Sequence, residues 1–254
     1  MDKLIYTAAS GARHILEQQA TTANNLANVG TNGFKKSRAV FEDLLYQNLR
    51  QPGAQSSQQT NLPSGMQLGT GVRPVAIERI HTQGNSQATG NDKDMMVSGN
   101  GFFNVLLPDG TTAYTRDGSF QLDSQGRMVN SNGLVVQGGI TVPANAEVQI
   151  ASDGTVSATV AGARPQTIGR LKLVTPEQAL TRGNDGLFRG PDGDLEADAT
   201  ARLQDGVLEG SNVSPVETMV AMITAARQFE QQMKLMQTSE KQEQAASKLL
   251  SNAG

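Results

Sequence analysis

The chain has 254 residues, enough for one large domain or two smaller ones with a real hydrophobic core. Its formal net charge of -3 argues against a protein that coats nucleic acid, and no run approaches the roughly 18 apolar residues of a membrane span. It has no cysteine and only two histidines, which excludes disulfides and thiolate chemistry and leaves too few ligands for a zinc site.

The first predicted element is a long helix from Asp2 to about Asn28. Asp2 is a suitable N-cap, and apolar residues, among them Ile5, Ile15 and Leu26, recur at steps of three and four. Gly30 stands where a left-handed residue would end the helix. Charged and glutamine residues replace the apolar segment of a secretory signal, so we expect no cleaved signal peptide.

Residues 37–80 are predicted to be an extended linker or loop region. The stretch 47–71 is polar and contains proline, glycine, serine and glutamine, which is typical of loops. A loop this long is usually functional or disordered. Two interpretations stay open: the segment reaches a neighbouring subunit, or it is a flexible tether.

Residues 81–210 are predicted to form a central antiparallel all-β domain. Short β-prone runs alternate with turn signals every seven or eight residues, such as the Asp-Gly pairs that begin at Asp109, Asp117 and Asp153. This spacing indicates successive hairpins.

The second predicted helix lies within residues 211–254. Ser214, Pro215 and Glu217 give it a capping box with proline at the first helical position. Its apolar residues follow alternating spacings of three and four, a heptad seam: Met219, Met222, Ala226, Phe229, Met233 and Met236. The predicted fold class is therefore α+β, with long N- and C-terminal helices forming a coiled-coil-like pair around a central antiparallel β domain. We expect both helices to be buried mainly between copies of the chain; packing within one chain is the alternative.

No motif supports catalysis. Asp92 and Asp94 are spaced like the start of a calcium loop, but the required glycine and distal glutamate are missing. Asp117 and Asp123 could be imagined as the paired carboxylates of a glycosidase, yet both adjoin hairpin turns. We therefore predict no catalytic residue, no metal and no cofactor.

Two further groups are interpreted as non-catalytic. His14 lies on the first helix without a nearby partner in sequence, which suggests a solvated or interface histidine. The basic cluster Lys35, Lys36 and Arg38 is too small for a nucleic-acid footprint and is interpreted as a solvated face.

Residues 23–35, ANNLANVGTNGFK, resemble the N-terminal signature of bacterial flagellar rod and hook proteins. The motif ends a helix with asparagine and glycine and anchors the turn through Phe34. Residues 99–103, 113–120 and 208–213 are similar to further segments of this family, so the resemblance covers nearly the whole chain.

Within the family, residues 1–8, 169–174, 185–189 and 225–234 look like the proximal-rod members, whereas residues 38–133 are similar to the distal-rod members. The terminal helices slightly favour the proximal type because they would set the position in the stack. The linker favours the distal type.

The resemblance implies a non-enzymatic structural subunit of the rod that crosses the periplasm. Such subunits are exported through the flagellar type III apparatus without a cleaved signal. They assemble helically with copies of themselves and with other rod and hook axial proteins, and they transmit torque. Their termini are typically disordered in the monomer. The residues expected at subunit interfaces are Ile5, Ile15, Leu26, Phe34, Met219, Met222, Phe229, Met233 and Met236.

The alternative from another class is a secreted trimeric protein whose β domain binds cell-wall glycan, with the termini as a coiled coil. A third interpretation gives that domain glycan-hydrolase activity through Asp117 and Asp123.

Overall fold

The computed structural model describes residues 2–43, 47–50, 55–57, 60–61, 66–68, 72–183, 185–191 and 193–251. Two long helices and many antiparallel strands confirm the α+β class with a β domain. The chain forms two compact units. Unit 1 comprises Met1–Ala27, Ser37–Ile80 and Ser214–Gly254; unit 2 comprises Asn28–Lys36 and His81–Val213.

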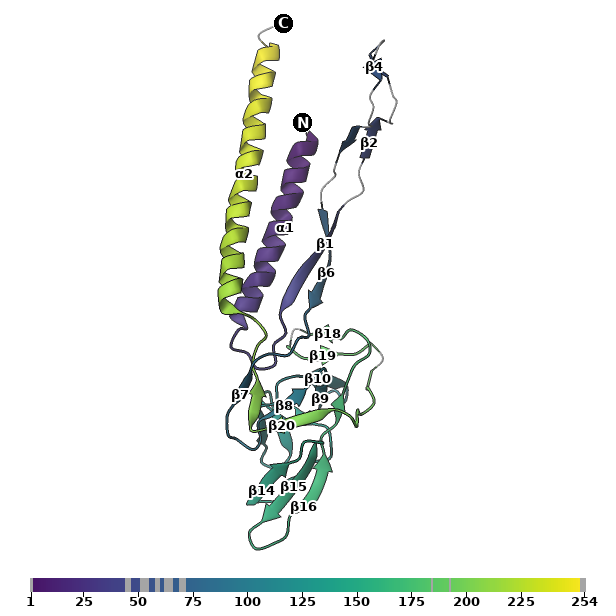
Figure 1. Cartoon of the computed structure of the whole chain (residues 1–254), viewed down its shortest axis with the longest axis vertical. Helices are drawn as coiled ribbons and strands as arrows, with labels where there is room; N and C mark the ends of the chain where they lie inside the picture. The colour runs from purple at the N-terminus through teal and green to yellow at the C-terminus, as the bar shows by residue number, and fades with distance from the viewer. Residues whose placement is uncertain are drawn as a thin grey trace. The chain divides into compact units, whose positions relative to one another are not determined.

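Unit 1 contains helices α1 (Asp2–Ala27) and α2 (Pro215–Ser251), which lie side by side (Figure 1). Helix α2 begins as predicted: the Ser214 hydroxyl accepts a hydrogen bond from the Glu217 amide at 3.4 Å. Within the described residues, neither helix combines the length and apolar composition of a membrane span.

Unit 1 also contains a β ribbon. Strand β1 (Ser37–Asp43) pairs antiparallel with β6 (Val72–Arg79), with a bulge at Val40/Phe41. Beyond it, β2 (Gln47–Arg50) pairs with β5 (Met66–Leu68), and β3 (Gln55–Ser57) with β4 (Thr60–Asn61). Part of the predicted linker is thus paired strand, because β-prone runs flank the polar stretch. The rest of 44–71 lies outside the described residues.

Unit 2 holds antiparallel sheets, as the turn spacing predicted. In the largest, β11, β12, β13, β9, β10, β19 and β18 follow one another and β17 pairs with β9. These strands are β9 (Phe102–Leu106), β10 (Thr112–Thr115), β11 (Phe120–Leu122), β12 (Met128–Asn130), β13 (Val135–Val136), β17 (Leu173–Val174), β18 (Thr181–Arg182) and β19 (Phe188–Arg189).

Smaller sheets complete unit 2. One contains β14 (Ala146–Ile150), β15 (Thr155–Val160) and β16 (Gln166–Arg170). Two pairs join distant parts of the chain, namely β8 (Met95–Ser98) with β20 (Arg202–Asp205), and β7 (Ser86–Ala88) with β21 (Val207–Glu209). Strand β21 thereby places Glu209 inside the unit just before the chain continues to α2.

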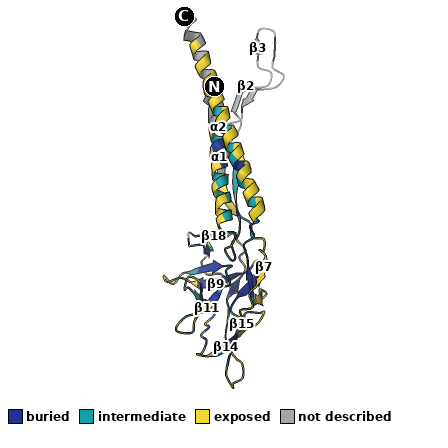
Figure 2. Ribbon diagram, turned by 90° about the vertical axis from the view of Figure 1, so that its left-hand side faces the viewer, coloured by how far each residue is buried: buried dark blue, intermediate teal, exposed yellow. Residues whose placement is uncertain are grey.

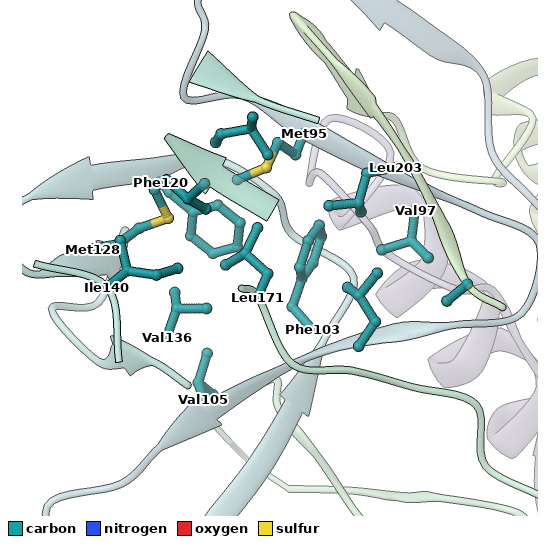
Figure 3. Close-up of a cluster of buried hydrophobic side chains, with 14 of the residues drawn as sticks. Met95, Val97, Phe103, Val105, Phe120, Met128, Val136, Ile140, Leu171 and Leu203 are labelled. Atoms are coloured by element: carbon teal, nitrogen blue, oxygen red, sulfur yellow. The ribbon is translucent and has the colours of Figure 1, made fainter. Parts of the chain in front are cut away.

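The core of unit 2 lies between these sheets (Figure 3). Phe103 and Phe120 meet edge to face, with ring centroids 4.9 Å apart. Buried aliphatic and methionine side chains surround them, including Met95, Val97, Val105, Met128, Val136, Ile140, Leu171 and Leu203. Unit 2 therefore has a hydrophobic core of its own.

Candidate assembly interface

Helix α1 carries a buried and half-buried stripe of mostly small residues. Ala8, Ala12 and Ile15 are buried, and the half-buried Gln19, Thr22 and Leu26 continue the stripe at alternating steps of four and three. This is heptad spacing, which matches the predicted pattern. Ile5 lies on the helix, but its side chain is outside the described residues.

Helix α2 presents its own heptad stripe, shifted by one position from the predicted seam. Ala226 of the predicted seam is half-buried next to the stripe. The stripe itself consists of buried or half-buried residues, namely Thr218, Met222, Ala225, Phe229, Gln232, Met236 and Ser239. A Cβ placed on Gly11 of α1 would lie 3.5 Å from the side-chain amide nitrogen of Gln232, so this member of the stripe lies against α1. Met222, Phe229 and Met236 belong to the stripe. Met219 and Met233 lie beside it and are 51% and 37% exposed.

The opposite side of α2 carries exposed apolar side chains in its first turns. Figure 2 shows that much of this part of the helix is exposed. We call Val216, Met219, Val220 and Ile223 the α2 patch; each is at least half exposed. At about 100° per residue, these positions lie across the helix axis from Ala225 and Phe229. A contiguous apolar patch on a helix marks an interaction surface.

The β ribbon of unit 1 has a second exposed apolar pair. Val75 and Ile77 are two residues apart on β6, so they lie on one face of the strand, and both are more than half exposed. Unit 1 thus exposes apolar side chains on both its helical and its β elements.

His14 has a partner within unit 1. Its ring centroid lies 3.6 Å from that of Phe41 on β1, and its Nδ1 atom is buried. His14 is therefore half-buried against a residue of the same chain and is not simply solvated. Phe41 lies on β1, 27 residues further along the chain, and the pattern of residues on the first helix does not predict that a strand packs against it.

The second part of the signature motif, residues 28–35, belongs to unit 2. The Gly33 amide donates a hydrogen bond to the Glu209 carbonyl oxygen at 2.7 Å, and Gly33 has φ +66°. Phe34 is only 2% exposed, and the Arg182 guanidinium lies 4.8 Å from its ring centroid. Gly33, not the predicted Gly30, is the left-handed glycine of this turn. Phe34 is already buried within a single chain.

Lys35 is buried, so its interpretation as part of a solvated face is wrong. It is 1% exposed, and its Nζ atom lies 2.6 Å from Glu209 Oε1. Arg116 Nε lies 3.0 Å from the other carboxylate oxygen. Burial lowers the pKa of both Lys35 and Arg116, and Glu209 opposes that shift.

The buried partners of Lys35, namely Glu209 and with it Arg116, could not be predicted from the sequence. Arg116 follows β10 and Glu209 ends β21, so neither is near Lys35 in sequence. Nothing in the spacing predicts that they meet. The one available signal was that both stand in segments that resemble the flagellar family, 113–120 and 208–213.

The two aspartates weighed for glycan hydrolysis stabilise turns. Asp117 accepts hydrogen bonds from the amide and hydroxyl of Ser119, at 3.1 and 2.7 Å. Asp123 accepts hydrogen bonds from the backbone and side chain of Arg127, and these bonds lower the pKa of Asp123. A general acid of a glycosidase needs a raised pKa, so Asp123 is unsuited to that role.

Comparison with known protein families connects these features. The model described as flagella basal body rod protein matches residues 5–35, and that of the flagellar hook protein FlgE/F/G D1 domain matches residues 96–158. A third, the flagellar basal body rod FlgEFG protein C-terminal model, matches residues 204–249. The three matches include α1 with the signature turn, much of the β unit, and α2.

Individual relatives extend over most of the chain. The flagellar basal-body rod protein FlgG of Buchnera aphidicola from Acyrthosiphon pisum is 46% identical, covering 89% of this chain and 92% of its own. FlgG of Caulobacter vibrioides is 38% identical over 96% and 98%. FlgF of Salmonella typhimurium is 38% identical over 99% of both chains. The chain therefore belongs to the flagellar basal-body rod proteins of the FlgF/FlgG type, which are structural, non-enzymatic components.

Proposed function

We propose that this chain is a rod subunit that polymerises helically through its terminal helices and transmits torque along the shaft. The observation that carries the proposal is the α2 patch, which is exposed on the side of α2 opposite the stripe that contacts α1. The partners are copies of the chain and other rod and hook axial proteins. Export through the type III apparatus without a cleaved signal, to the periplasmic rod, is part of the same proposal.

The patch favours polymerisation because a contact with a different surface on the next copy does not close on itself. Such a heterologous contact builds an open helical filament when the rotation does not close a ring. Each of the four side chains would gain about 1 kcal/mol from burial of its exposed half. Several weak contacts repeated along a filament add up without making the free monomer insoluble.

The predicted interface residues divide into two groups under this proposal. Met219 and Met233, both exposed, would contact the next subunit directly. Met222, Phe229 and Met236, with Ile15 and Leu26, would act by holding α1 and α2 in a coiled-coil-like pair. Ile5 would contact another subunit through the first turns of α1. Phe34, which is 2% exposed, would act indirectly by holding the signature turn inside unit 2.

The position within the rod is a separate question. The preference for the proximal-rod type is not confirmed, because relatives named FlgG reach 46% identity whereas those named FlgF reach 38%. We propose the distal-rod, FlgG-like type. Complementation tests this choice: swimming should return in cells that lack FlgG and not in cells that lack FlgF. The reverse result would support the proximal type.

Polymerisation through the α2 patch is tested by Met219→Asp and Ile223→Asp, with Gln228→Asp as a matched control. Gln228 is exposed on α2 outside the patch, so the control adds the same charge without touching the apolar surface. We expect both patch variants to keep the circular dichroism of the folded chain and to lose polymer growth by electron microscopy. Normal polymers from both would refute the role of the patch.

No observation favours the glycan-binding alternative. The aspartates that suggested glycan chemistry are bonded within their own turns, and the terminal helices belong to a family of rod proteins.

A further inference from the structure

We propose that Glu209 is a positioning residue for rod assembly. Together with Lys35, Arg116 and Asn212 it forms what we call the junction clasp, a group of bonds inside unit 2 that ties together the segments leading to unit 1. The inference rests on the proposed function, because the elements that these segments lead to are the proposed assembly elements.

The chain connectivity shows why this location matters. The chain passes between the two units after Ala27, after Lys36, after Ile80 and after Val213. Two clasp residues, Lys35 and Asn212, lie next to two of these passages, and Thr82, whose carbonyl oxygen accepts hydrogen bonds from both, lies within two positions of a third. The clasp therefore fixes where the segments to β1, β6 and α2 leave unit 2.

The carboxylate of Glu209 is the centre of the clasp. Its Oε1 atom accepts hydrogen bonds from Lys35 Nζ at 2.6 Å and from the Gly84 amide at 2.8 Å. Its Oε2 atom lies 3.0 Å from Arg116 Nε. One buried side chain therefore holds three segments that are far apart in sequence.

Asn212 adds a second, less buried set of bonds. Its Oδ1 atom accepts a hydrogen bond from the Lys36 amide at 2.7 Å, and its Nδ2 atom donates to the Thr82 carbonyl oxygen at 3.0 Å. Lys35 Nζ donates to the same carbonyl oxygen at 2.8 Å. The shared acceptor couples the Asn212 bonds to those of Glu209.

The chemistry of the clasp favours a geometric role over simple stabilisation. It buries two cations against one carboxylate, and the Gly99 and Gly101 carbonyl oxygens accept the remaining hydrogen bonds of the Arg116 guanidinium. Buried ion pairs of this kind are often no more stable than apolar side chains of similar volume. What they add is geometric specificity, since each bond forms only when the backbone segments that carry its two partners adopt one conformation.

The test uses the full-length chain with Glu209→Gln and Asn212→Ala, and Glu78→Gln as the control. Glu78 forms an exposed ion pair with Arg38, so the control makes the same chemical change outside the clasp. Hydrogen exchange by NMR should show the Gly84 amide losing protection about tenfold or more in both clasp variants, while β9 and β10 stay protected. Asn212 does not bond Gly84, so loss there in Asn212→Ala measures coupling. Bacteria in which a gene for either clasp variant replaces the rod gene should swim poorly.

Unchanged protection at Gly84 in Asn212→Ala would overturn the coupling. Normal swimming of both variants with an intact core would overturn the positioning role. If Glu209→Gln unfolds unit 2, the result for Asn212→Ala alone decides the positioning role. That variant keeps the Glu209 carboxylate, so no buried cation loses its counterion. Failure of the unmodified chain to restore swimming would instead refute the proposed function, and the exchange result would still decide whether the clasp exists.

Discussion

Replacement of Gly33 by alanine should destabilise unit 2 by about 2–5 kcal/mol. A φ of +66° costs an alanine about 1–2 kcal/mol. In addition, a Cβ at this position would lie 2.5 Å from the Arg116 carbonyl carbon and 2.7 Å from the Asp117 amide nitrogen. Both neighbours are backbone atoms of the segment that joins β10 to β11, so they cannot swing aside as a flexible side chain could, and such overpacking costs about 1–3 kcal/mol.

Gly30→Ala is the matched control, since it makes the same change three residues earlier. A Cβ on Gly30 would meet no atom within 4 Å, and Gly30 does not adopt the left-handed conformation. Alanine there should be neutral or should stabilise by up to about 1 kcal/mol, because it restricts the unfolded chain.

Differential scanning calorimetry of the full chain measures both variants. Unit 2 has about 140 residues, so 1 kcal/mol corresponds to about 3 °C in Tm. The Tm of unit 2 should fall by about 6–15 °C in Gly33→Ala and change by less than about 3 °C in Gly30→Ala. Equal Tm values for the two variants would refute the claim that the turn packs against the Arg116 backbone.

Three further outcomes are expected. Tyr114→Phe should lower the free energy of unfolding, measured by chemical denaturation, by about 1–3 kcal/mol. The buried hydroxyl donates a hydrogen bond to the Gly193 carbonyl oxygen and accepts one from the Leu195 amide, and both groups would lose a partner. An unchanged free energy of unfolding would contradict this. Hydrogen bonds from the Thr175 and Thr200 hydroxyls lower the pKa of Asp198 to about 2, so its contribution to stability is complete above about pH 4 and is lost as the pH falls through about 2; an NMR titration midpoint near 4 would disprove the bonds. Met233→Asp should abolish assembly by placing a charge in a contact between subunits, and normal filaments and swimming from that variant would rule out the contact.

The local features of the fold were predictable from sequence. The hairpins of unit 2 depend on short turns such as those at Asp109 and Asp123, whose carboxylates accept hydrogen bonds from amides two residues later. The start of α2 is equally local, because Ser214 caps the helix with its own hydroxyl. Such interactions depend on adjacent residues, so the sequence contains all the information they need.

The helix stripe shows where a pattern of apolar residues is incomplete. The contact stripe of α2 includes Thr218, Ala225, Gln232 and Ser239, and polar or small residues do not register in a search for an apolar seam. The apolar residues alone therefore define the register of the heptad pattern only to within one position. The predicted seam contains Met219, whereas the stripe in the structure contains Thr218 and leaves Met219 beside it. On a helix that shift is about 100°, enough to move a side chain from the contact to the edge of an exposed patch.

The clasp shows the opposite limit, in which no local pattern exists. Lys35 and Glu209 are 174 residues apart and meet because β21 pairs with β7 and the signature turn packs beside them. A lysine next to Lys36 and Arg38 is usually solvated, and only the long-range partner reverses that expectation.

The signature motif acquires a physical meaning from this contact. It stands at the end of α1, yet its glycine, phenylalanine and lysine all bind unit 2: Gly33 fits against the Arg116 backbone, Phe34 packs under Arg182, and Lys35 pairs with Glu209. The helix itself needs only a residue that stops it after Ala27. The three residues therefore hold the chain that follows α1 inside unit 2. Every contact in this attachment comes from one chain, so its formation requires no second copy.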